Sequence, residues 1–341
     1  MRRTSSSISS SDPNRTWRRF AAWLGATLGA GLAALYGFVV LVDPWDTLPL
    51  SPQASRVPIS TNARFSFPAL ARSPRFDAVI LGTSTARLLQ PAQLDAPFQA
   101  RFANLAMNSA TAYEQSRLLE VFLRAHPRPR AVVIGLDASW CGPAPERYTP
   151  RPFPEWMYGP NRWAGYREML TPYAVQEAAN QFAVMAGWKR RRYGLDGYTS
   201  FVPDDAAYDR GRVAAAFERW PPVDQQLAGA APPALPAMAM LAGLLRTLPP
   251  VTQAVLFFPP NHISQHGEPG SAAAAEWAAC KAEAARIAVE TGATVLDFMV
   301  ASPITTDRDN YWDPLHYRTA VAGRVATALA GATSPDVVRL R

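Results

Sequence analysis

The chain has 341 residues, of which 48% are apolar and 18% are charged, and its formal net charge is +7. This is enough apolar sequence for one large core and a membrane anchor. Residues 1–19 contribute +4 of the charge, which leaves +3 for the rest of the chain and argues against a nucleic-acid-binding protein. The sequence has no glycine-rich phosphate loop and no zinc-finger spacing, so we expect no cofactor, metal or nucleic-acid partner.

An uncharged apolar run extends from Phe20 to Val42. Its 23 residues are enough to cross a hydrocarbon core of about 30 Å as a helix. The run is longer than the apolar part of a signal peptide, and no clear cleavage site precedes Asp43. We therefore predict a transmembrane helix over residues 20–42. A cleaved signal and a buried core helix are the alternatives, although a core helix would usually have a polar face.

The basic residues are distributed unevenly about this run. Five arginines lie in residues 1–19, whereas Arg56 is the only basic residue between Asp43 and Asn62. The positive-inside rule places the Ser-rich tail, residues 1–19, in the cytoplasm and exports the rest. We therefore predict a single-pass protein of the inner (plasma) membrane whose folded part lies in the periplasm or outside. Residues 43–75, rich in Pro, Ser and Arg, are predicted to be a linker with little structure of its own.

From Asp77 onward, short apolar runs alternate with helical patterns. Strands are predicted over 78–81, 102–107, 131–134, 254–258 and 294–298, and helices over 113–125, 271–290 and 317–329. This alternation predicts an α/β fold with a parallel sheet covered by helices on both faces. Ligands of such sheets bind beyond the carboxyl ends of the strands.

Residues 142–228 interrupt the alternation. They are rich in aromatic residues and proline and contain the basic run 189–192, Lys-Arg-Arg-Arg. We interpret this segment as an insertion or cap over the site. The basic run is predicted to be a solvated face, with a groove for an acidic glycan as the alternative.

Two short motifs far apart in the chain contain the residues of one kind of chemistry. The predicted strand 78–81 runs into Gly82-Thr83-Ser84, which presents a hydroxyl, and Asp313-Pro314-Leu315-His316 places a carboxylate three residues before an imidazole. A serine, a histidine that takes its proton and an aspartate that orients the histidine are the parts of nucleophilic acyl transfer. If one sheet carries both motifs, Ser84 Oγ should lie within hydrogen-bond reach of His316, and Asp313 should face the other imidazole nitrogen.

The order of these motifs resembles the SGNH/GDSL hydrolase superfamily, and in particular its membrane-anchored members of the alginate O-acetylation type. The resemblance covers roughly residues 76–332 and is carried by Gly82-Thr83-Ser84 with Arg87, by the run 104–109 (Asn-Leu-Ala-Met-Asn-Ser), and by Asp313-x-x-His316-Tyr317. It implies a three-layer, flavodoxin-like domain. It also implies that Ser84, rather than Thr83 or Thr85, is the nucleophile, with His316 as base and Asp313 as the orienting carboxylate.

The resemblance further implies oxyanion donors from a glycine and an asparagine in the second and third motifs of the superfamily. Ser109 and Asp137 stand where those residues would fall. An ionised Asp137 would repel an oxyanion, so we expect it to be structural, and Asn108 is predicted to supply a side-chain donor instead. Arg87, Ser109 and His262 complete the predicted oxyanion and substrate-binding set.

Two further pairs of residues bear on the site. His262 and His266 share a loop, but no third ligand stands at a recognisable spacing, so no metal site is predicted. Cys141 and Cys280 could form a disulfide in an oxidising exterior compartment. Their separation in sequence does not show whether they are close enough.

Together, the motifs and the resemblance predict a membrane-anchored, extracytoplasmic serine acyl-ester hydrolase or O-acyltransferase acting on acetyl groups of an exported polysaccharide. Its expected partners are the membrane, the acylated glycan and a membrane-bound O-acyltransferase. One alternative is a general carboxylesterase, including an α/β-hydrolase, although the α/β-hydrolase nucleophile usually follows several strands and Ser84 ends the first. The other is a catalytically silent glycan-binding or assembly protein of a polysaccharide-modification complex.

Overall fold

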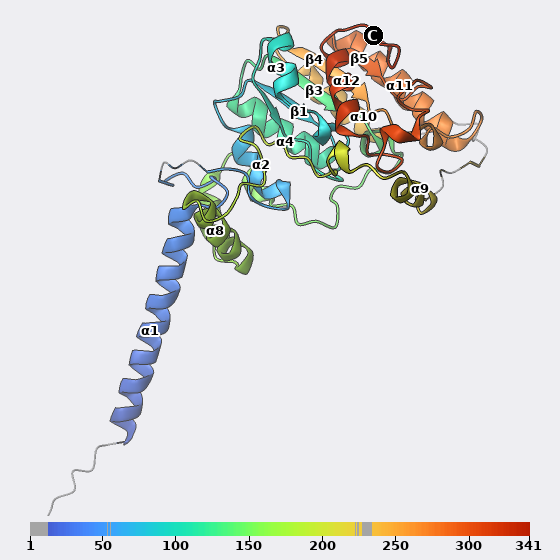
Figure 1. Ribbon diagram of the computed structural model, residues 1–341. Coiled ribbons are helices and arrows are strands. Elements are labelled where there is room, and N and C mark those ends of the chain that lie inside the picture. The colour runs from blue at the N-terminus through green and yellow to red at the C-terminus, as the bar shows by residue number, and fades with distance from the viewer. Residues whose placement is uncertain (1–12, 53, 55, 222, 224, 227–233) are drawn as a thin grey trace, which may run out of the picture.

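A long helix leads into an α/β domain in the computed structural model, which describes residues 13–341 except 53, 55, 222, 224 and 227–233 (Figure 1). The domain is built on a six-stranded sheet with the order β2-β1-β3-β4-β5-β6. The strands are β1 (Ala78–Leu81), β2 (Phe102–Asn104), β3 (Ala131–Gly135), β4 (Gln253–Phe258), β5 (Thr294–Asp297) and β6 (Val338–Arg339). Strands β1 to β5 are parallel, and β6 is antiparallel to β5. The predicted α/β class with a largely parallel sheet is therefore confirmed.

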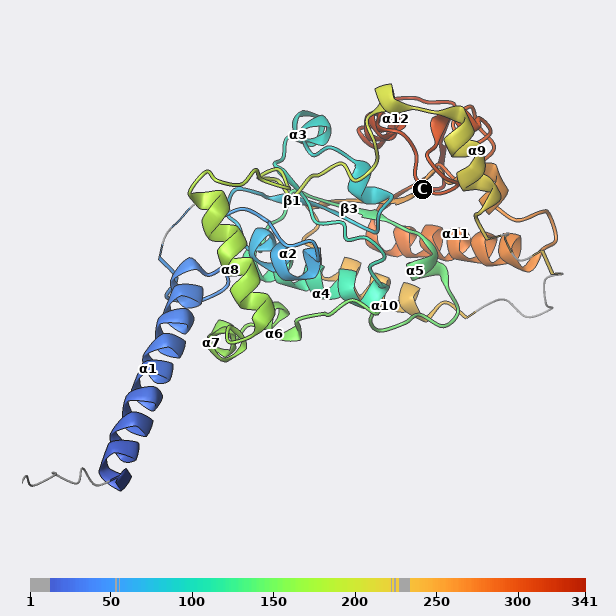
Figure 2. The same cartoon turned by 60° about the horizontal axis from the view of Figure 1, so that its bottom comes forward.

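Alternate residues of the central strands enter two separate cores, one on each face of the sheet. Val79 and Leu81 pack on one face, whereas Ala78 and Ile80 pack on the other. The first face is covered by α4 (Ala112–Ala125), α10 (Pro236–Arg246) and α11 (Ala272–Thr291), and the second by α3 (Ala92–Phe98) and α12 (Thr319–Leu329), as Figure 2 shows. Strands β1 and β3 are apolar throughout because both of their faces are buried.

Several elements lie outside the predicted pattern. Strand β2 ends at Asn104, earlier than predicted, and the two-residue edge strand β6 was not predicted because its residues are exposed and carry no apolar run. The other helices are α2 (Ala63–Ala71), α5 (Ala138–Cys141), α6 (Glu155–Tyr158), α7 (Gly165–Glu168), α8 (Pro172–Met185) and α9 (Arg210–Glu218). Short 3₁₀ turns occupy 86–88, 162–164, 205–207, 263–265 and 308–310.

Helix α1 (Pro13–Val42) contains the predicted membrane segment. Its part Asn14–Val42 is long and apolar enough to cross a membrane, and most of it is exposed in the structure. Arg56 closes its carboxyl end, because its guanidinium donates to the backbone oxygens of Val42 (2.6 Å) and Leu41 (3.3 Å), which have no partner within the helix.

The prediction of an unstructured linker over residues 43–75 is wrong. Trp45 and Leu48 are buried in the main core, and residues 63–71 form α2, which begins at an Asn62 side-chain cap. The proline and serine content of this stretch suggested a loop, but its apolar residues pack against the domain. The chain therefore leaves α1 directly into folded structure.

The predicted insertion at residues 142–228 packs against two separate parts of the molecule. Helix α8 packs against α1. This part of the insertion therefore does not form the predicted cap over the site. The later part reaches the site, where Phe201 contacts the ring of His316 and Phe217 contacts that of His262. Residues 189–192 are exposed, as predicted.

Candidate active site

The turn after β1 requires a glycine and presents Ser84. Gly82 has a φ of +142°, and a Cβ at this position would lie 2.5 Å from the Cβ of Ala86. Only glycine accommodates both the backbone conformation and the close approach. The backbone N–H of Met107 donates to the Gly82 oxygen at 3.0 Å and holds the turn against the segment after β2. Ser84 is therefore placed at the carboxyl end of the sheet.

His316 lies within hydrogen-bond reach of Ser84, although the two residues are 232 positions apart. The distance from His316 Nε2 to Ser84 Oγ is 2.8 Å, and that from His316 Nδ1 to Asp313 Oδ2 is 2.7 Å. The expected contacts are thus present, and they have the order of a nucleophile, a base and an orienting carboxylate. When the carboxylate accepts a hydrogen bond from Nδ1–H, the unprotonated Nε2 faces Ser84 and is free to accept the serine proton.

The Asp313 carboxylate is held ready for this role by its own turn. Its Oδ1 accepts hydrogen bonds from the backbone N–H groups of Leu315 and His316, both at 2.9 Å. Burial raises the pKa of Asp313, but the hydrogen bonds and charge of His316 together with these backbone donors outweigh burial, so that the pKa lies below its ordinary value. Asp313 is therefore ionised at neutral pH.

Backbone contacts and buried tyrosines join the histidine turn to the rest of the site. The Tyr317 hydroxyl donates to the backbone oxygen of Thr85 at 2.7 Å, which links the residue after His316 to the residue after Ser84. On the other side, the backbone N–H of His262 donates to the Pro314 oxygen at 2.9 Å. The tyrosine bond fixes the separation of the two motifs, and the His262 bond joins the histidine turn to the loop after β4. The tyrosine bond could not be read from the sequence, because Tyr317 is fully buried only through packing across the molecule.

A cavity of about 860 Å³ opens beside Ser84. Its lining includes Ser109 after β2, Asp137 after β3 and Asn261 after β4, so the cavity lies at the carboxyl ends of the strands, where parallel sheets bind ligands. Asn261 was missed by sequence reasoning, although its position after a predicted strand was a usable signal. Its buried Oδ1 has no hydrogen-bond partner in the part of the chain that the structure describes.

Asp137 is paired, as expected. The hydroxyl of Thr83 donates to its Oδ2, and the hydroxyl and backbone N–H of Ser139 donate to its Oδ1 at 2.6 and 2.9 Å. Burial raises the pKa of Asp137 against these hydrogen bonds. The carboxyl group caps α5, and each of its two oxygens already accepts a hydrogen bond.

The side chain of Asn108 contacts Arg87. Its Oδ1 accepts a hydrogen bond from Arg87 Nη1 at 3.0 Å, and the Arg87 guanidinium stacks over Tyr193 and Phe201. Phe201 in turn contacts the His316 ring edge-on, with ring centroids 5.3 Å apart. Neither Arg87 nor Asn108 is among the described residues that line the cavity. Arg87 is therefore linked to His316 through Phe201, whose ring contacts both side chains.

His262 is likewise structural in its side-chain contacts. Its Nδ1 accepts from the backbone N–H of Ser264 at 3.2 Å and caps the turn at 263–265, while its ring packs against Phe217 and Tyr311. Burial lowers the pKa of His262. It is absent from the cavity lining in the described part of the chain. No contact of the His262 side chain therefore supports the prediction that it binds substrate.

Cys141 and Cys280 form a disulfide with a Cα–Cα distance of 5.4 Å. The bond joins α5, directly after the Asp137 cap, to α11. It therefore holds the wall of the cavity to a helix that covers the sheet.

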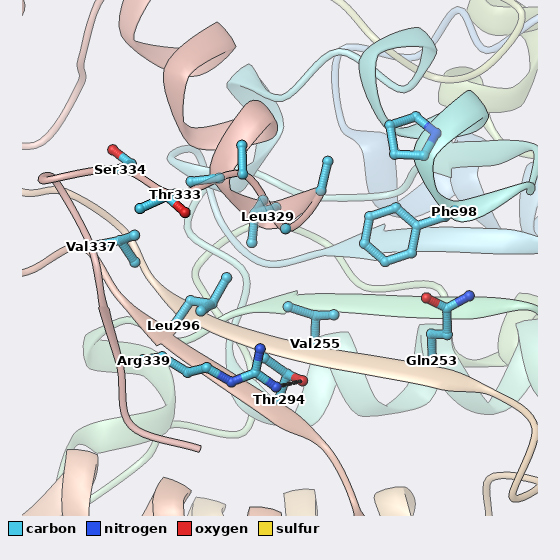
Figure 3. Close-up of a pocket in the computed structure, with 15 residues that line it drawn as sticks. Phe98, Gln253, Val255, Thr294, Leu296, Leu329, Thr333, Ser334, Val337 and Arg339 are labelled. Atoms are coloured by element: carbon cyan, nitrogen blue, oxygen red, sulfur yellow. Dashed lines mark hydrogen bonds between the residues drawn. The ribbon is translucent and has the colours of Figure 1, made fainter.

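A second cavity, of about 400 Å³, lies at the opposite ends of the strands (Figure 3). It is lined by Gln253 and Thr294, which open β4 and β5, and Arg339 donates to Thr294 Oγ1 at 3.2 Å. None of the described residues that line it belongs to either motif. We therefore assign the candidate site to the cavity beside Ser84.

Comparisons with known proteins do not assign this chain to a family, so the site is assigned from its geometry. No group of three or more His, Cys, Asp and Glu side chains that could hold a metal occurs within the described residues. No protein-family model matches this sequence, and no curated protein matches it significantly. The superfamily resemblance therefore stays a prediction, and the function has to be inferred from the contacts of Ser84, His316 and Asp313.

Proposed function

We propose that the protein is a membrane-anchored, extracytoplasmic serine acyl-ester hydrolase or O-acyltransferase of the SGNH type, acting on acetyl groups of an exported polysaccharide. One observation carries the proposal. The chain of contacts from Ser84 Oγ through His316 to Asp313, at 2.8 and 2.7 Å, lies beside a cavity of about 860 Å³. Three polar side chains so aligned have the geometry needed to activate a serine hydroxyl.

The reaction begins when Ser84 Oγ attacks the ester carbonyl carbon while His316 Nε2 takes the hydroxyl proton. The resulting imidazolium is stabilised by Asp313, whose carboxylate is ionised for the reasons given above. His316 then gives the proton to the departing alkoxide, and the acyl group stays on Ser84. A second nucleophile removes it by the same steps in reverse order. Water as that nucleophile gives hydrolysis, and a sugar hydroxyl gives transfer.

The negative oxygen formed in each step needs donors. We assign the backbone N–H of Ser84 and the Nδ2 amide group of Asn261, because Asn261 follows β4 and lines the cavity beside Ser84. Asp137 does not oppose this arrangement, since both of its oxygens accept hydrogen bonds from Thr83 or Ser139. Asn108 is not assigned this role because it is absent from the cavity lining in the described part of the chain.

The SGNH-type assignment is supported by the order of the site along the fold. The nucleophile follows the first strand, and the Asp-x-x-His turn directly precedes the last helix, α12. The α/β-hydrolase alternative is disfavoured because its nucleophile usually follows several strands. Thr149, Glu146 and Arg151 line the cavity beside Ser84 and provide hydrogen-bonding groups for the hydroxyls of a glycan.

The test uses the full chain in detergent with p-nitrophenyl acetate as substrate. Ser84→Ala and His316→Ala should each lower kcat/KM by roughly a thousandfold or more, and Asp313→Asn should lower it less far. Ser334→Ala, in the second cavity, is the matched serine control and should keep the parent rate. Equal rates in the parent and all site variants would contradict the hydrolase proposal. They would favour the alternative of a catalytically silent assembly protein.

Acetate release from an acetylated alginate then separates a glycan esterase from a general carboxylesterase. A glycan enzyme should release acetate from the polymer, and Ser84→Ala should not. Activity confined to the small chromogenic ester would favour the carboxylesterase alternative.

A further inference from the structure

The exposed part of α1 is too short to span a bilayer by itself. The uncharged run begins at Phe20, and its residues are exposed as far as Leu35, after which the helix meets the domain. These sixteen residues rise about 24 Å at 1.5 Å per residue, whereas the hydrocarbon core is about 30 Å thick. Residues 36–42 must supply the rest of the span. Whatever packs on them therefore lies at the level of the lipid.

Helices α7 and α8 pack on those residues. The Tyr36 hydroxyl donates to the backbone oxygen of Tyr166 at 2.9 Å, and the rings of Phe38 and Phe182 are 5.9 Å apart. Phe38 lies four residues before Val42, about 6 Å along the helix axis. Figure 1 shows α8 beside the end of α1 that meets the domain. The carboxyl half of α8 is thus at the membrane boundary if α1 crosses the bilayer.

The carboxyl end of α8 and the residues directly after it leave apolar side chains partly or largely exposed. Phe182 is 42% exposed, Met185 is 43% exposed and Trp188 is 77% exposed. Phe182 and Trp188 contact each other, with ring centroids 5.6 Å apart. An aromatic patch next to a membrane helix is typical of interfacial anchoring, since tryptophan favours the boundary between lipid and water.

A basic group follows the patch directly. Residues 189–192 are exposed, and none of them forms a salt bridge with a described residue. A cavity of about 510 Å³ lies between the two kinds of side chain, lined by Val57, Val184 and Met185 with Lys189, Arg190 and Arg191. Apolar walls beside cationic groups match the acyl chain and the phosphate of an anionic phospholipid.

We propose that residues 182–192 form a second membrane contact, in which Phe182, Met185 and Trp188 enter the outer leaflet and Lys189–Arg192 bind anionic lipid headgroups. A single transmembrane helix leaves the attached domain free to tilt over the membrane. A second contact beside α1 removes that freedom and sets the orientation of the domain. The inference rests on α1 crossing the membrane but not on the chemistry of Ser84.

The experiment measures lipid contact by spin labels on the full chain in nanodiscs. Both cysteines are in the disulfide, so one introduced cysteine takes the label alone. The test site is Trp188→Cys. Leu41→Cys, on the exposed side of α1, is the lipid reference, and Val289→Cys, exposed on α11, is the water reference. Equal thermal unfolding midpoints show that the variants are folded.

In nanodiscs that contain phosphatidylglycerol, the label at 188 should be open to oxygen and protected from a water-soluble nickel complex, as at 41. A label at 188 that behaves like the one at 289 overturns the proposal while the anchor stands. A water-exposed label at 41 overturns the anchor as well. An immobile label at 188 that oxygen does not reach indicates a protein partner and also overturns the proposal.

The proposed contact between the basic residues and anionic headgroups is tested by changing Lys189, Arg190, Arg191 and Arg192 together to Gln. Each cation near an anionic surface contributes attraction, so nickel accessibility at 188 should rise roughly severalfold in this variant. The parent should show the same rise when phosphatidylcholine replaces phosphatidylglycerol. No response to either change overturns the headgroup contact.

Discussion

Asp137 shows how a carboxyl group can lie next to a nucleophile without blocking its chemistry. It stands one strand away from Ser84 and lines the same cavity, yet it is a helix cap whose oxygens accept hydrogen bonds from Thr83 and Ser139. Removing the carboxylate charge should therefore affect folding more than it affects the acyl transfer step.

The pH dependence of stability tests the environment of Asp137. Burial raises its folded-state pKa above the ordinary 3.8, so the folded state binds more protons than the unfolded state as pH rises through this region. The contribution of Asp137 to stability is full below pH 3.8 and is lost as pH rises through the raised pKa. The unfolding midpoint of Asp137→Asn relative to the parent should therefore increase between pH 4 and pH 7. A difference that stays flat or decreases with pH would contradict the raised pKa.

At the scale of elements, a buried ion pair holds the loop that forms one wall of the cavity. Arg64 of α2 binds Glu114 of α4 through two bonds of 2.9 and 2.5 Å, and both side chains are almost wholly buried. Glu114 also completes the cap of α4 with Thr111, while Arg64 donates to the backbone oxygen of Ser109 at 3.4 Å. The pair thus positions the segment from 108 to 111.

Glu114→Gln should lower the free energy of unfolding by about 3–5 kcal/mol, because it leaves the Arg64 charge buried without its partner. The matched control is Glu120→Gln in the same helix, whose partner Arg117 is partly exposed and whose loss should cost less than about 1 kcal/mol. Urea unfolding of the detergent-solubilised protein measures both changes. Equal losses in the two variants would show that the Arg64 pair is not held in a buried environment.

At the scale of the whole molecule, the disulfide joins α5 and α11 through cysteines that are 139 positions apart. Replacing both cysteines by alanine should lower the free energy of unfolding by about 2–5 kcal/mol. A reductant should lower the midpoint of the parent to that of the double variant and leave the variant unchanged. A reductant effect of equal size in the double variant would place the cause outside the bond between Cys141 and Cys280.

The same bond bears on the orientation of the chain in the membrane, since disulfides persist in oxidising compartments. The arginines before α1 predict the same outcome, with the domain exported. Alkaline phosphatase fused after Arg341 should be active, and β-galactosidase fused there should be inactive. The reverse pattern would place Ser84 in the cytoplasm and remove the case for an exported glycan.

Much of the fold was predictable because its cause is local. The uncharged run of α1, the apolar strands β1 and β3 and the amphipathic helix α4 each have their apolar residues at the spacing that their conformation requires. The residue types of the Ser84 and His316 motifs likewise limited the chemistry to a few classes. Residues 43–75 were misjudged because their proline and serine content indicates loops, while the few apolar side chains that bury them are too widely spaced to show a period.

The sequence by itself determined the membrane-length helix, the alternation of strands and helices and the candidate nucleophile, base and carboxylate. Only the tertiary structure decided that Ser84 lies next to His316, that Arg87 donates to Asn108 and that α8 lies against α1. The physical reason is the same in each case. A pattern in the chain fixes which side chains a segment buries, but the partner of a side chain is chosen by packing between segments that are far apart in the sequence.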